Sequence, residues 1–157
     1  MASHTIGIIV NGATGRIGST QHLANALIPI IVEGGLAVGD DRLVPRLLLT
    51  GRDGGRLAAV ARTHKLADWT TDLDAALADP AYTIFFDAAA TQGRVAVLEK
   101  AIAAGKHIYC EKPVAPTAAQ GLALLQEARG ARREARRGRG QGPSSRAAEA
   151  CRAGAGR

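Results

Sequence analysis

The chain has 157 residues, a length that suits one domain, and 46% of them are hydrophobic, enough to build a core. No apolar run approaches the ~20 residues of a membrane-spanning helix, and residues 1–4 lack the features of a signal peptide, so we expect a cytoplasmic protein without a membrane partner. The net charge of +6 lies wholly in residues 126–157, with nine arginines and three glutamates, whereas residues 1–125 are balanced; this excludes a generally basic surface for nucleic acid.

The first motif combines a short buried strand, over residues 5–10, with a glycine-rich turn and a helix that starts at Ile17. Strand, glycine turn and helix form the arrangement in which a helix N-terminus receives a phosphate. In this interpretation Gly12 allows the tight turn, Gly15 lets the backbone approach a pyrophosphate, and Gly18 lets the helix pack close to the strand. The spacing is G-x-x-G-x-x-G, so the alternative is an ordinary glycine-rich turn.

The first helix carries its buried side chains at helical spacing, on Ile17, Ala24, Leu27, Ile28 and Ile31. Pro29 interrupts this pattern and is expected to kink the helix or to end its regular part near Ile28. Residues 39–41 form a surface loop, and residues 44–50 form the second strand, with Pro45 at its start.

Arg52 follows the second strand, where a doubly wound sheet meets the adenosine ribose of a dinucleotide. Asp40 and Asp41 lie before the strand, so they fall at the wrong end of the sheet for a ribose-binding acid. Arg52 could instead pair with a 2′-phosphate or stack on adenine, and the alternative is a solvated loop arginine. Asp53 is expected to cap a helix over residues 54–64.

Strands and helices alternate through the rest of the chain. The patterns predict strands at residues 66–69, 82–86 and 106–110, a short helix capped by Thr71 or Asp72, a helix carrying Val95, Leu98 and Ile102, and a helix capped by Thr117 that carries Leu122 and Leu125. Such alternation implies right-handed βαβ units. We therefore predict an α/β fold, a Rossmann-type doubly wound parallel sheet.

Glu111 and Lys112 directly follow the fifth predicted strand, on the same rim of the sheet as the glycine turn. A lysine there can stabilise a developing alkoxide or relay a proton, and a glutamate can accept hydrogen bonds from a ribose. The alternative is a surface ion pair, which contributes little. His64 has no partner at metal-ligand spacing, so we expect no metal site, and Cys110 and Cys151 are expected to be free thiols.

The stretch Ala101-Ile-Ala-Ala-Gly-Lys-His-Ile-Tyr-Cys-Glu-Lys-Pro113 resembles the signature of the Gfo/Idh/MocA family of NAD(P)-dependent sugar and cyclitol dehydrogenases. The resemblance covers about residues 5–128 and implies that Lys112 is the catalytic lysine and that Glu111 and Lys112 border the nicotinamide. It also implies that the pyrophosphate is held by Gly12, Ala13, Thr14, Gly15, Arg16 and Ile17. Thr91 matches a threonine that often follows the fourth strand of these enzymes, but Gln92-Gly93-Arg94 replaces the usual proline–asparagine.

The family resemblance also implies a second domain that completes the active site, and the sequence after residue 128 does not match one. Residues 126–157 contain no Val, Ile, Leu, Met, Phe, Tyr or Trp, so we predict a cofactor domain over residues 1–128 and a disordered Arg/Gly/Ala-rich tail over 129–157. The abrupt change is typical of translation in a shifted reading frame. The alternative is a nucleic-acid-binding arm centred on residues 136–140, which lacks aromatic residues for stacking.

These patterns predict the NAD(P)-binding domain of an oxidoreductase that acts on CH–OH groups of a sugar or cyclitol, truncated and inactive alone. The cofactor is NADP or NAD, with Arg52 favouring NADP. The expected partner is a small sugar-like substrate rather than nucleic acid, and a homo-oligomer is expected only with the second domain. The alternative function is a non-catalytic dinucleotide-binding sensor or regulatory module.

Overall fold

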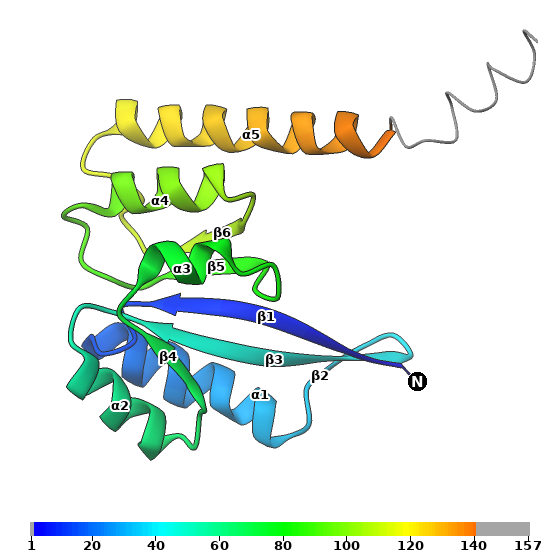
Figure 1. The fold of residues 1–157 in the computed structure, drawn as a ribbon, viewed down its shortest axis with the longest axis vertical. Coiled ribbons are helices and arrows are strands. Elements are labelled where there is room, and N and C mark those ends of the chain that lie inside the picture. Colours follow the sequence, from blue (N-terminus) through cyan, green and yellow to red (C-terminus); the bar gives the residue numbers. More distant parts are fainter. Residues whose placement is uncertain (1, 141–157) are drawn as a thin grey trace, which may run out of the picture.

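The computed structural model describes the backbone of residues 2–140 and the side chains of residues 2–131. Strands and helices alternate along this part of the chain (Figure 1). The elements in order are β1 (Ser3–Asn11), η1 (a π-helix, Ile17–Leu27), α1 (Ile28–Val32), β2 (Leu36–Val38), β3 (Asp41–Thr50), α2 (Gly54–Thr63), β4 (Asp68–Thr70), α3 (Leu73–Ala78), β5 (Ile84–Asp87), α4 (Arg94–Ala103), β6 (His107–Cys110) and α5 (Ala118–Gly140).

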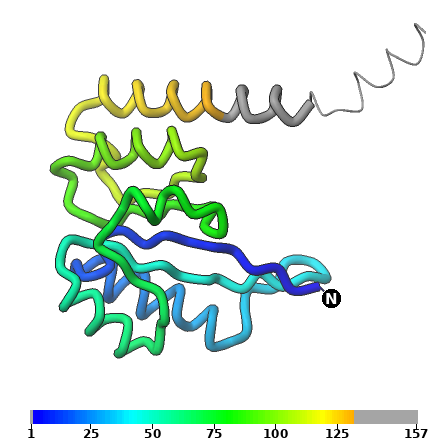
Figure 2. The backbone as a smooth tube through the Cα atoms, viewed as in Figure 1, coloured from blue at the N-terminus to red at the C-terminus, as the bar shows by residue number. Residues whose placement is uncertain are grey.

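The strands form one sheet in the order β2-β3-β1-β5-β6, and β4 pairs with β3. All pairings are parallel except that of β2, which forms an antiparallel hairpin with β3. The chain builds outward from β1 to β3 and β4, then crosses through α3 to β5 on the other side of β1 (Figure 2). The strand order therefore reverses between β1 and β5, the position at which doubly wound sheets bind ligands.

Register aligns the carboxyl ends of the central strands. Asn11 at the end of β1 pairs with Thr50 of β3 on one side and with Asp87 of β5 on the other, and Asp87 pairs in turn with Cys110 of β6. Because the polar side chains come at the last residue of each strand, the sheet ends in a polar rim. The predicted Rossmann-type α/β fold is confirmed.

Two hydrophobic cores cover the two faces of the sheet, since successive residues of a strand point to opposite faces. Ile9 and Phe85 pack in the core beneath α3, α4 and α5, whereas their neighbours Val10 and Phe86 pack in the core beneath η1, α1 and α2. The helices of each group lie on their own side of the sheet in Figure 1. Burial on both faces explains why β1 and β5 read as continuous apolar runs.

Helix N-termini form where the sequence predicts caps. The Asp53 carboxylate accepts a hydrogen bond from the Arg56 N–H at the start of α2, and the Asp72 carboxylate accepts one from the Ala75 N–H at the start of α3. The Thr117 hydroxyl accepts from the Gln120 N–H at the start of α5. These side chains satisfy donors that the first turn of a helix leaves free.

The first helix and the second strand differ from their predictions. The helix is π-wound through Leu27 and becomes an α-helix at Ile28, next to Pro29, so the regular part begins near Ile28, where the sequence predicted a kink or the end of the regular part. Because a π-helix bonds i to i+5, the 3.6-residue period fails there, and Leu23, which the predicted stripe omits, is the fully buried residue. Strand β3 begins at Asp41, so Pro45 lies in its interior and not at its start.

Pro45 is tolerated because of where the partners of β3 stop. On the outer edge of β3, β2 pairs with residues 41–43 and β4 pairs with residues 48–50, so Pro45 falls between the two paired segments. A strand position without a partner on one side does not need its N–H on that side. The β2–β3 hairpin itself was not predicted, because only its connection, residues 39–41, was interpreted as a loop and no strand was assigned to residues 36–38.

The last helix extends further than the sequence predicts. Helix α5 packs on α4 and runs to Gly140, across residue 128, where the cofactor domain was expected to end. Residues 129–140 thus have a helical backbone where a disordered tail was expected. Of the two leucines expected on this helix, Leu122 and Leu125 are both exposed, and Leu124 provides the buried contact. The remainder of the predicted tail, 141–157, lies outside the described residues.

Candidate functional site: a pocket at the carboxyl ends of the strands

The turn between β1 and η1 depends on close backbone approaches. Gly12 has a φ of 76°, and a Cβ there would lie 2.6 Å from the Ala89 Cα in the loop after β5. A Cβ on Gly18 would lie 2.4 Å from the Gly12 carbonyl oxygen. Only glycine fits both positions without a shift of the backbone. The tight turn at Gly12 and the close packing at Gly18 are therefore present as predicted.

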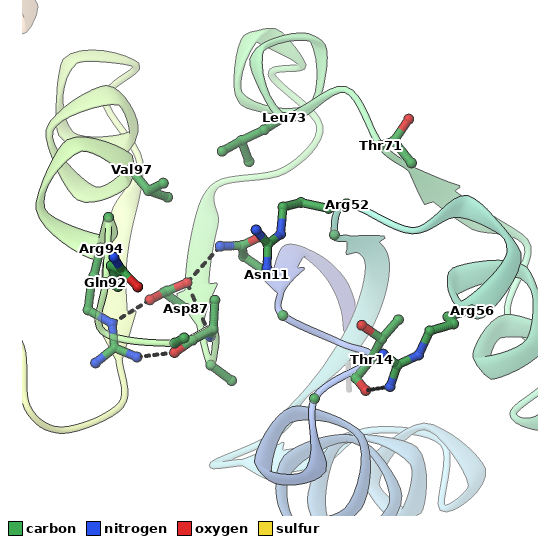
Figure 3. Close-up of a pocket in the computed structure, with 17 residues that line it drawn as sticks. Asn11, Thr14, Arg52, Arg56, Thr71, Leu73, Asp87, Gln92, Arg94 and Val97 are labelled. Carbon is green, nitrogen blue, oxygen red and sulfur yellow. Dashed lines mark hydrogen bonds and ion pairs between the residues drawn. The ribbon is translucent and has the colours of Figure 1, made fainter.

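An open pocket of ≈ 700 Å³ lies over this turn, a volume typical of small-molecule and cofactor sites (Figure 3). It extends across the ends of β1, β3 and β5, where the strand order reverses. The residues that line it are Asn11, Gly12, Thr14, Gly15, Gly51, Arg52, Arg56, Thr71, Leu73, Asp87, Ala88, Ala89, Ala90, Gln92, Gly93, Arg94 and Val97.

One edge of the pocket carries two exposed arginines, Arg52 after β3 and Arg56 in the first turn of α2; we call this pair the arginine edge. The Arg56 Nη2 donates to the Thr14 carbonyl oxygen over 3.0 Å, which ties α2 to the glycine turn. The Arg52 guanidinium forms no hydrogen bond or ion pair with another described residue. Two guanidinium groups beside exposed backbone favour an anionic group, such as a phosphate, at this edge.

The opposite edge contains a chain of polar side chains that we call the buried network: Thr50, Asp87 and Arg94 are buried and Asn11 is half-buried. The Thr50 hydroxyl donates to the Asn11 Oδ1 over 3.2 Å, and the Asn11 Nδ2 donates to the Asp87 Oδ1 over 2.7 Å. The Arg94 Nε donates to the Asp87 Oδ2 over 2.6 Å, and both side chains of this ion pair are at least 98% buried. Figure 3 shows Asp87 between Asn11 and Arg94.

The rest of the Arg94 guanidinium binds backbone carbonyls. Its Nη1 donates to the carbonyl oxygens of Glu111, over 2.7 Å, and Pro113, over 2.5 Å, and its Nη2 donates to that of Ala89, over 2.5 Å. Arg94 thus joins the loop after β5 to the loop after β6. A buried arginine that pairs its charge and satisfies its donors avoids the penalty of an unpaired buried ion.

Glu111 is held from the other face of the sheet. The His22 Nε2 on η1 lies 2.5 Å from the Glu111 Oε1, and the His22 ring packs edge-on against Phe86 with a centroid distance of 4.7 Å. Hydrogen bonding to His22, with a smaller contribution from the Lys112 N–H, lowers the pKa of Glu111 below its ordinary value. Lys112 itself is exposed. The end of β6 therefore presents an ionised carboxylate and a solvent-facing ammonium.

The sequence of the chain matches the family model described as "Oxidoreductase family, NAD-binding Rossmann fold", designated GFO_IDH_MocA, over residues 46–136. This match covers more than half of the chain. The chain belongs to this family.

A D-xylose dehydrogenase from Paenarthrobacter nicotinovorans is 42% identical over 120 residues, which make up 76% of this chain and 31% of that protein. Two solved structures share the fold. Levoglucosan dehydrogenase in complex with NADH and levoglucosan matches with a TM-score of 0.65 and 24% identity over 80% of this chain and 32% of that one. Biliverdin reductase from Synechocystis, in complex with biliverdin and NADP⁺, matches with a TM-score of 0.57 and 26% identity over 81% and 35%.

Within this Gfo/Idh/MocA domain, four of the predicted cofactor-binding residues line the pocket: Gly12, Thr14, Gly15 and Arg52. The other predicted residues lie elsewhere. Ala13 is fully buried in the core, and the lining also omits Arg16, Ile17, Thr91, Glu111 and Lys112. Glu111 and Lys112 are nevertheless connected to the pocket by hydrogen bonds. The lining residue Arg94 donates to the backbone carbonyl oxygens of Glu111 and Pro113, on both sides of Lys112.

The sequence analysis did not single out several polar residues that lie in or beside this pocket, among them Asn11, His22, Arg56, Asp87 and Arg94. Asn11 and Asp87 could have been found, because each is a polar residue at the end of an apolar strand. His22, Arg56 and Arg94 carry no local signal, since their partners come from other elements. In the part of the chain that the structure describes, no cluster of three metal-ligating side chains occurs, and no helix there is long and apolar enough to span a membrane.

Proposed function

We propose that residues 2–140 bind a nicotinamide dinucleotide and serve as the cofactor domain of a dehydrogenase that oxidises a CH–OH group of a sugar or cyclitol. The observation that carries the proposal is the open pocket over the glycine turn, at the reversal of strand order, in a chain of an NAD-binding oxidoreductase family. The likeness to a D-xylose dehydrogenase supports a sugar as the substrate class, although the chain spans only 31% of that relative.

The residues of the pocket fit the two ends of such a cofactor. Gly15 is exposed on the turn, and its missing side chain leaves space for a pyrophosphate above the start of η1. The arginine edge would hold the adenosine end, with Arg52 beside a 2′-phosphate, so that NADP binds at least as well as NAD. The nicotinamide would then lie over the ends of β1 and β5, near Asp87 and the loop after it.

The bound cofactor would accept a hydride from the substrate carbon. The chain's own part in that reaction is to orient the nicotinamide and to place a polar group near the substrate hydroxyl. Lys112 would be the catalytic residue: its ammonium can stabilise the developing alkoxide or relay the hydroxyl proton. Glu111, ionised through its contact with His22, would accept hydrogen bonds from the nicotinamide ribose.

Calorimetric titration of the 157-residue chain with NADPH, NADH and ADP-ribose tests the cofactor. We expect saturable binding of both nicotinamide cofactors at one site per chain, with NADPH at least as tight as NADH. Absence of binding by a folded chain would overturn the proposal. A strong preference for NADH would overturn only the role of Arg52.

Hydride transfer from a sugar should not occur with this chain alone. Lys112 is exposed and lies outside the lining of the open pocket, so the described residues do not enclose the proposed catalytic ammonium together with a substrate. An assay of NAD(P)H formation with a panel of sugars and cyclitols should show no turnover. Turnover that is lost in Lys112→Ala would contradict this expectation and make one domain sufficient.

The position of Lys112 outside the lining also supports the alternative function, a non-catalytic module that reports dinucleotide binding. The two functions differ in what Lys112 does when the chain is joined to a substrate-binding partner domain. In a dehydrogenase, Lys112→Ala lowers kcat and leaves cofactor affinity nearly unchanged. In a sensor module, the joined protein shows no turnover to lose, and Lys112→Ala leaves cofactor affinity unchanged.

A further inference from the structure

Arg94 directs its described hydrogen bonds at the protein itself and not at solvent. It is 3% exposed at the start of α4, yet it belongs to the lining of the pocket. Its four described contacts reach one carboxylate, that of Asp87, and three backbone carbonyls, from two different loops. No single contact of this kind would require an arginine, but the combination does, because only a planar fork reaches several acceptors at once.

The contacts fall on both sides of one residue. The Nη1 of Arg94 binds the carbonyl oxygen of Glu111, the residue before Lys112, and that of Pro113, the residue after it. With both neighbouring carbonyls fixed to one nitrogen, the backbone of Lys112 has little freedom to rotate. The Glu111 side chain adds a third restraint, since its Oε2 accepts from the Lys112 N–H over 3.2 Å.

The Arg94 guanidinium, whose Nη1 binds these carbonyls, is itself held in place. Asp87 fixes the Nε of Arg94, and Asn11 fixes the other carboxylate oxygen of Asp87, so the guanidinium is oriented from the end of β1. Every group in this path is at a strand end or in the first turn of a helix. A guanidinium restrained in this way loses little further entropy when it binds the carbonyls.

We propose that Arg94 is a positioning residue that fixes the backbone on both sides of Lys112 and so sets the nicotinamide end of the site. This inference rests on the proposed function for the role of Lys112, but not for the restraint itself. Because Gln92, Gly93 and Arg94 also line the pocket, the same segment meets a ligand at the end of β5. Loss of the Arg94 contacts should therefore disturb the nicotinamide end of the pocket and spare the adenosine end.

The test uses Arg94→Lys in the 157-residue chain. Lysine keeps the positive charge beside Asp87 but lacks the fork that reaches both carbonyls. The first measurement is amide hydrogen exchange by NMR at Glu111, Lys112 and Val114, compared with Gly15. The second is the affinity for NADH compared with ADP-ribose, which lacks the nicotinamide. Arg56→Lys is the matched control, because Arg56 also donates to a backbone carbonyl but lies on the arginine edge.

In Arg94→Lys we expect exchange at Lys112 to rise on the order of tenfold with Gly15 unchanged, as expected for loss of charge-assisted hydrogen bonds. NADH affinity should fall about tenfold further than ADP-ribose affinity. In Arg56→Lys the two ligands should weaken by the same factor. If Arg94→Lys does not fold, the neutral pair Asp87→Asn with Arg94→Gln gives the same two measurements, since glutamine is too short to reach the carbonyls.

Unchanged exchange at residues 111–114 in the folded variant would overturn the positioning role. Equal loss of NADH and ADP-ribose affinity would also overturn it, because a general loss of structure affects both ligands. If the native chain bound neither ligand, the proposed function would fail, while the exchange measurement would still decide whether Arg94 restrains Lys112.

Discussion

The two edges of the pocket use arginine in opposite ways. On the arginine edge, Arg52 and Arg56 are exposed and keep most of their donors toward solvent. In the buried network, Arg94 is enclosed and directs its described hydrogen bonds at the protein itself. An exposed guanidinium is available to a ligand, whereas a buried one holds segments of the protein together through its hydrogen bonds.

This difference shows why residue type alone does not assign a role at a binding site. Arg52 and Arg94 both follow a strand of the same sheet and both line the same pocket. What separates them is the neighbouring carboxylate: Asp87 takes up the charge of Arg94 inside the protein, whereas Asp53, next to Arg52, is used to cap α2. The edge that presents free charge is the one suited to an anionic ligand.

The largest expected effect comes from breaking the buried ion pair. Arg94→Met should lower the free energy of unfolding by about 3–5 kcal/mol, because it leaves the buried Asp87 carboxylate without its counter-ion, with only neutral donors such as Asn11 beside it. The exposed pair between Lys100 and Asp74, with side chains 54% and 72% exposed, is the control, and Lys100→Met should cost about 0–1 kcal/mol. Urea unfolding measures both. Similar losses in the two variants would show that burial does not distinguish the pairs.

The next effect concerns the glycine turn that both edges share. Gly15→Val should reduce dinucleotide affinity at least about a hundredfold, because its branched side chain would occupy the space proposed for the pyrophosphate. A Cβ at Gly15 would lie 3.2 Å from the Gly12 carbonyl oxygen, so the backbone needs only a small shift and the fold should form. Gly15→Ala, which adds the Cβ alone, should bind more tightly than the valine variant. Unaltered affinity in folded Gly15→Val would refute the phosphate role.

The features predicted correctly from the sequence are those that depend on neighbours along the chain. The glycine turn, the helix caps at Asp53 and Thr117 and the alternation of strand and helix each have a local cause. The parallel pairing of β1 with β3 and β5 follows from that alternation, because βαβ units place successive strands in parallel. For the same reason the sequence alone predicts that Gly12, Gly15 and Arg52 lie at one rim of the sheet, where all three line the pocket.

The features that were missed depend on contacts between distant elements. Arg94 is bound by residues from two loops, and its partners at Glu111 and Pro113 are defined only when β5 and β6 pair. The contact between His22 and Glu111 joins residues 89 positions apart.

A smaller effect tests the arginine edge directly. Arg52→Ala should lower NADPH affinity about tenfold and leave NADH affinity nearly unchanged, because an exposed guanidinium contributes through charge-assisted bonds to a 2′-phosphate. Calorimetric titration of both cofactors measures the preference in the native chain and the variant. Arg62→Ala is the control, since Arg62 is exposed on α2 but lies outside the pocket lining. An unchanged preference in Arg52→Ala would assign Arg52 to solvent.

The smallest effect concerns the Glu111 carboxylate at the end of β6. Its burial is intermediate between that of the arginine edge and that of the buried network. The hydrogen bond from His22 lowers the pKa of Glu111, so this contact stabilises the fold above the ordinary glutamate pKa, and the stabilisation is lost as the pH falls through the lowered value. His22→Phe keeps a ring against Phe86 but removes the donor, so the pKa of Glu111 should rise toward its ordinary value.

NMR titration of the Glu111 carboxyl carbon measures this shift, and His64→Phe, at the end of α2 and away from Glu111, is the control. The difference in stability between native chain and His22→Phe should be present at pH 7 and disappear in acid, where Glu111 is protonated in both. A Glu111 titration that is identical in native chain and His22→Phe would show that solvent, and not the helix η1, determines the charge at this end of the site. The charge of Glu111 would then be set by solvent, as for the exposed arginines of the arginine edge, and not by protein contacts, as in the buried network.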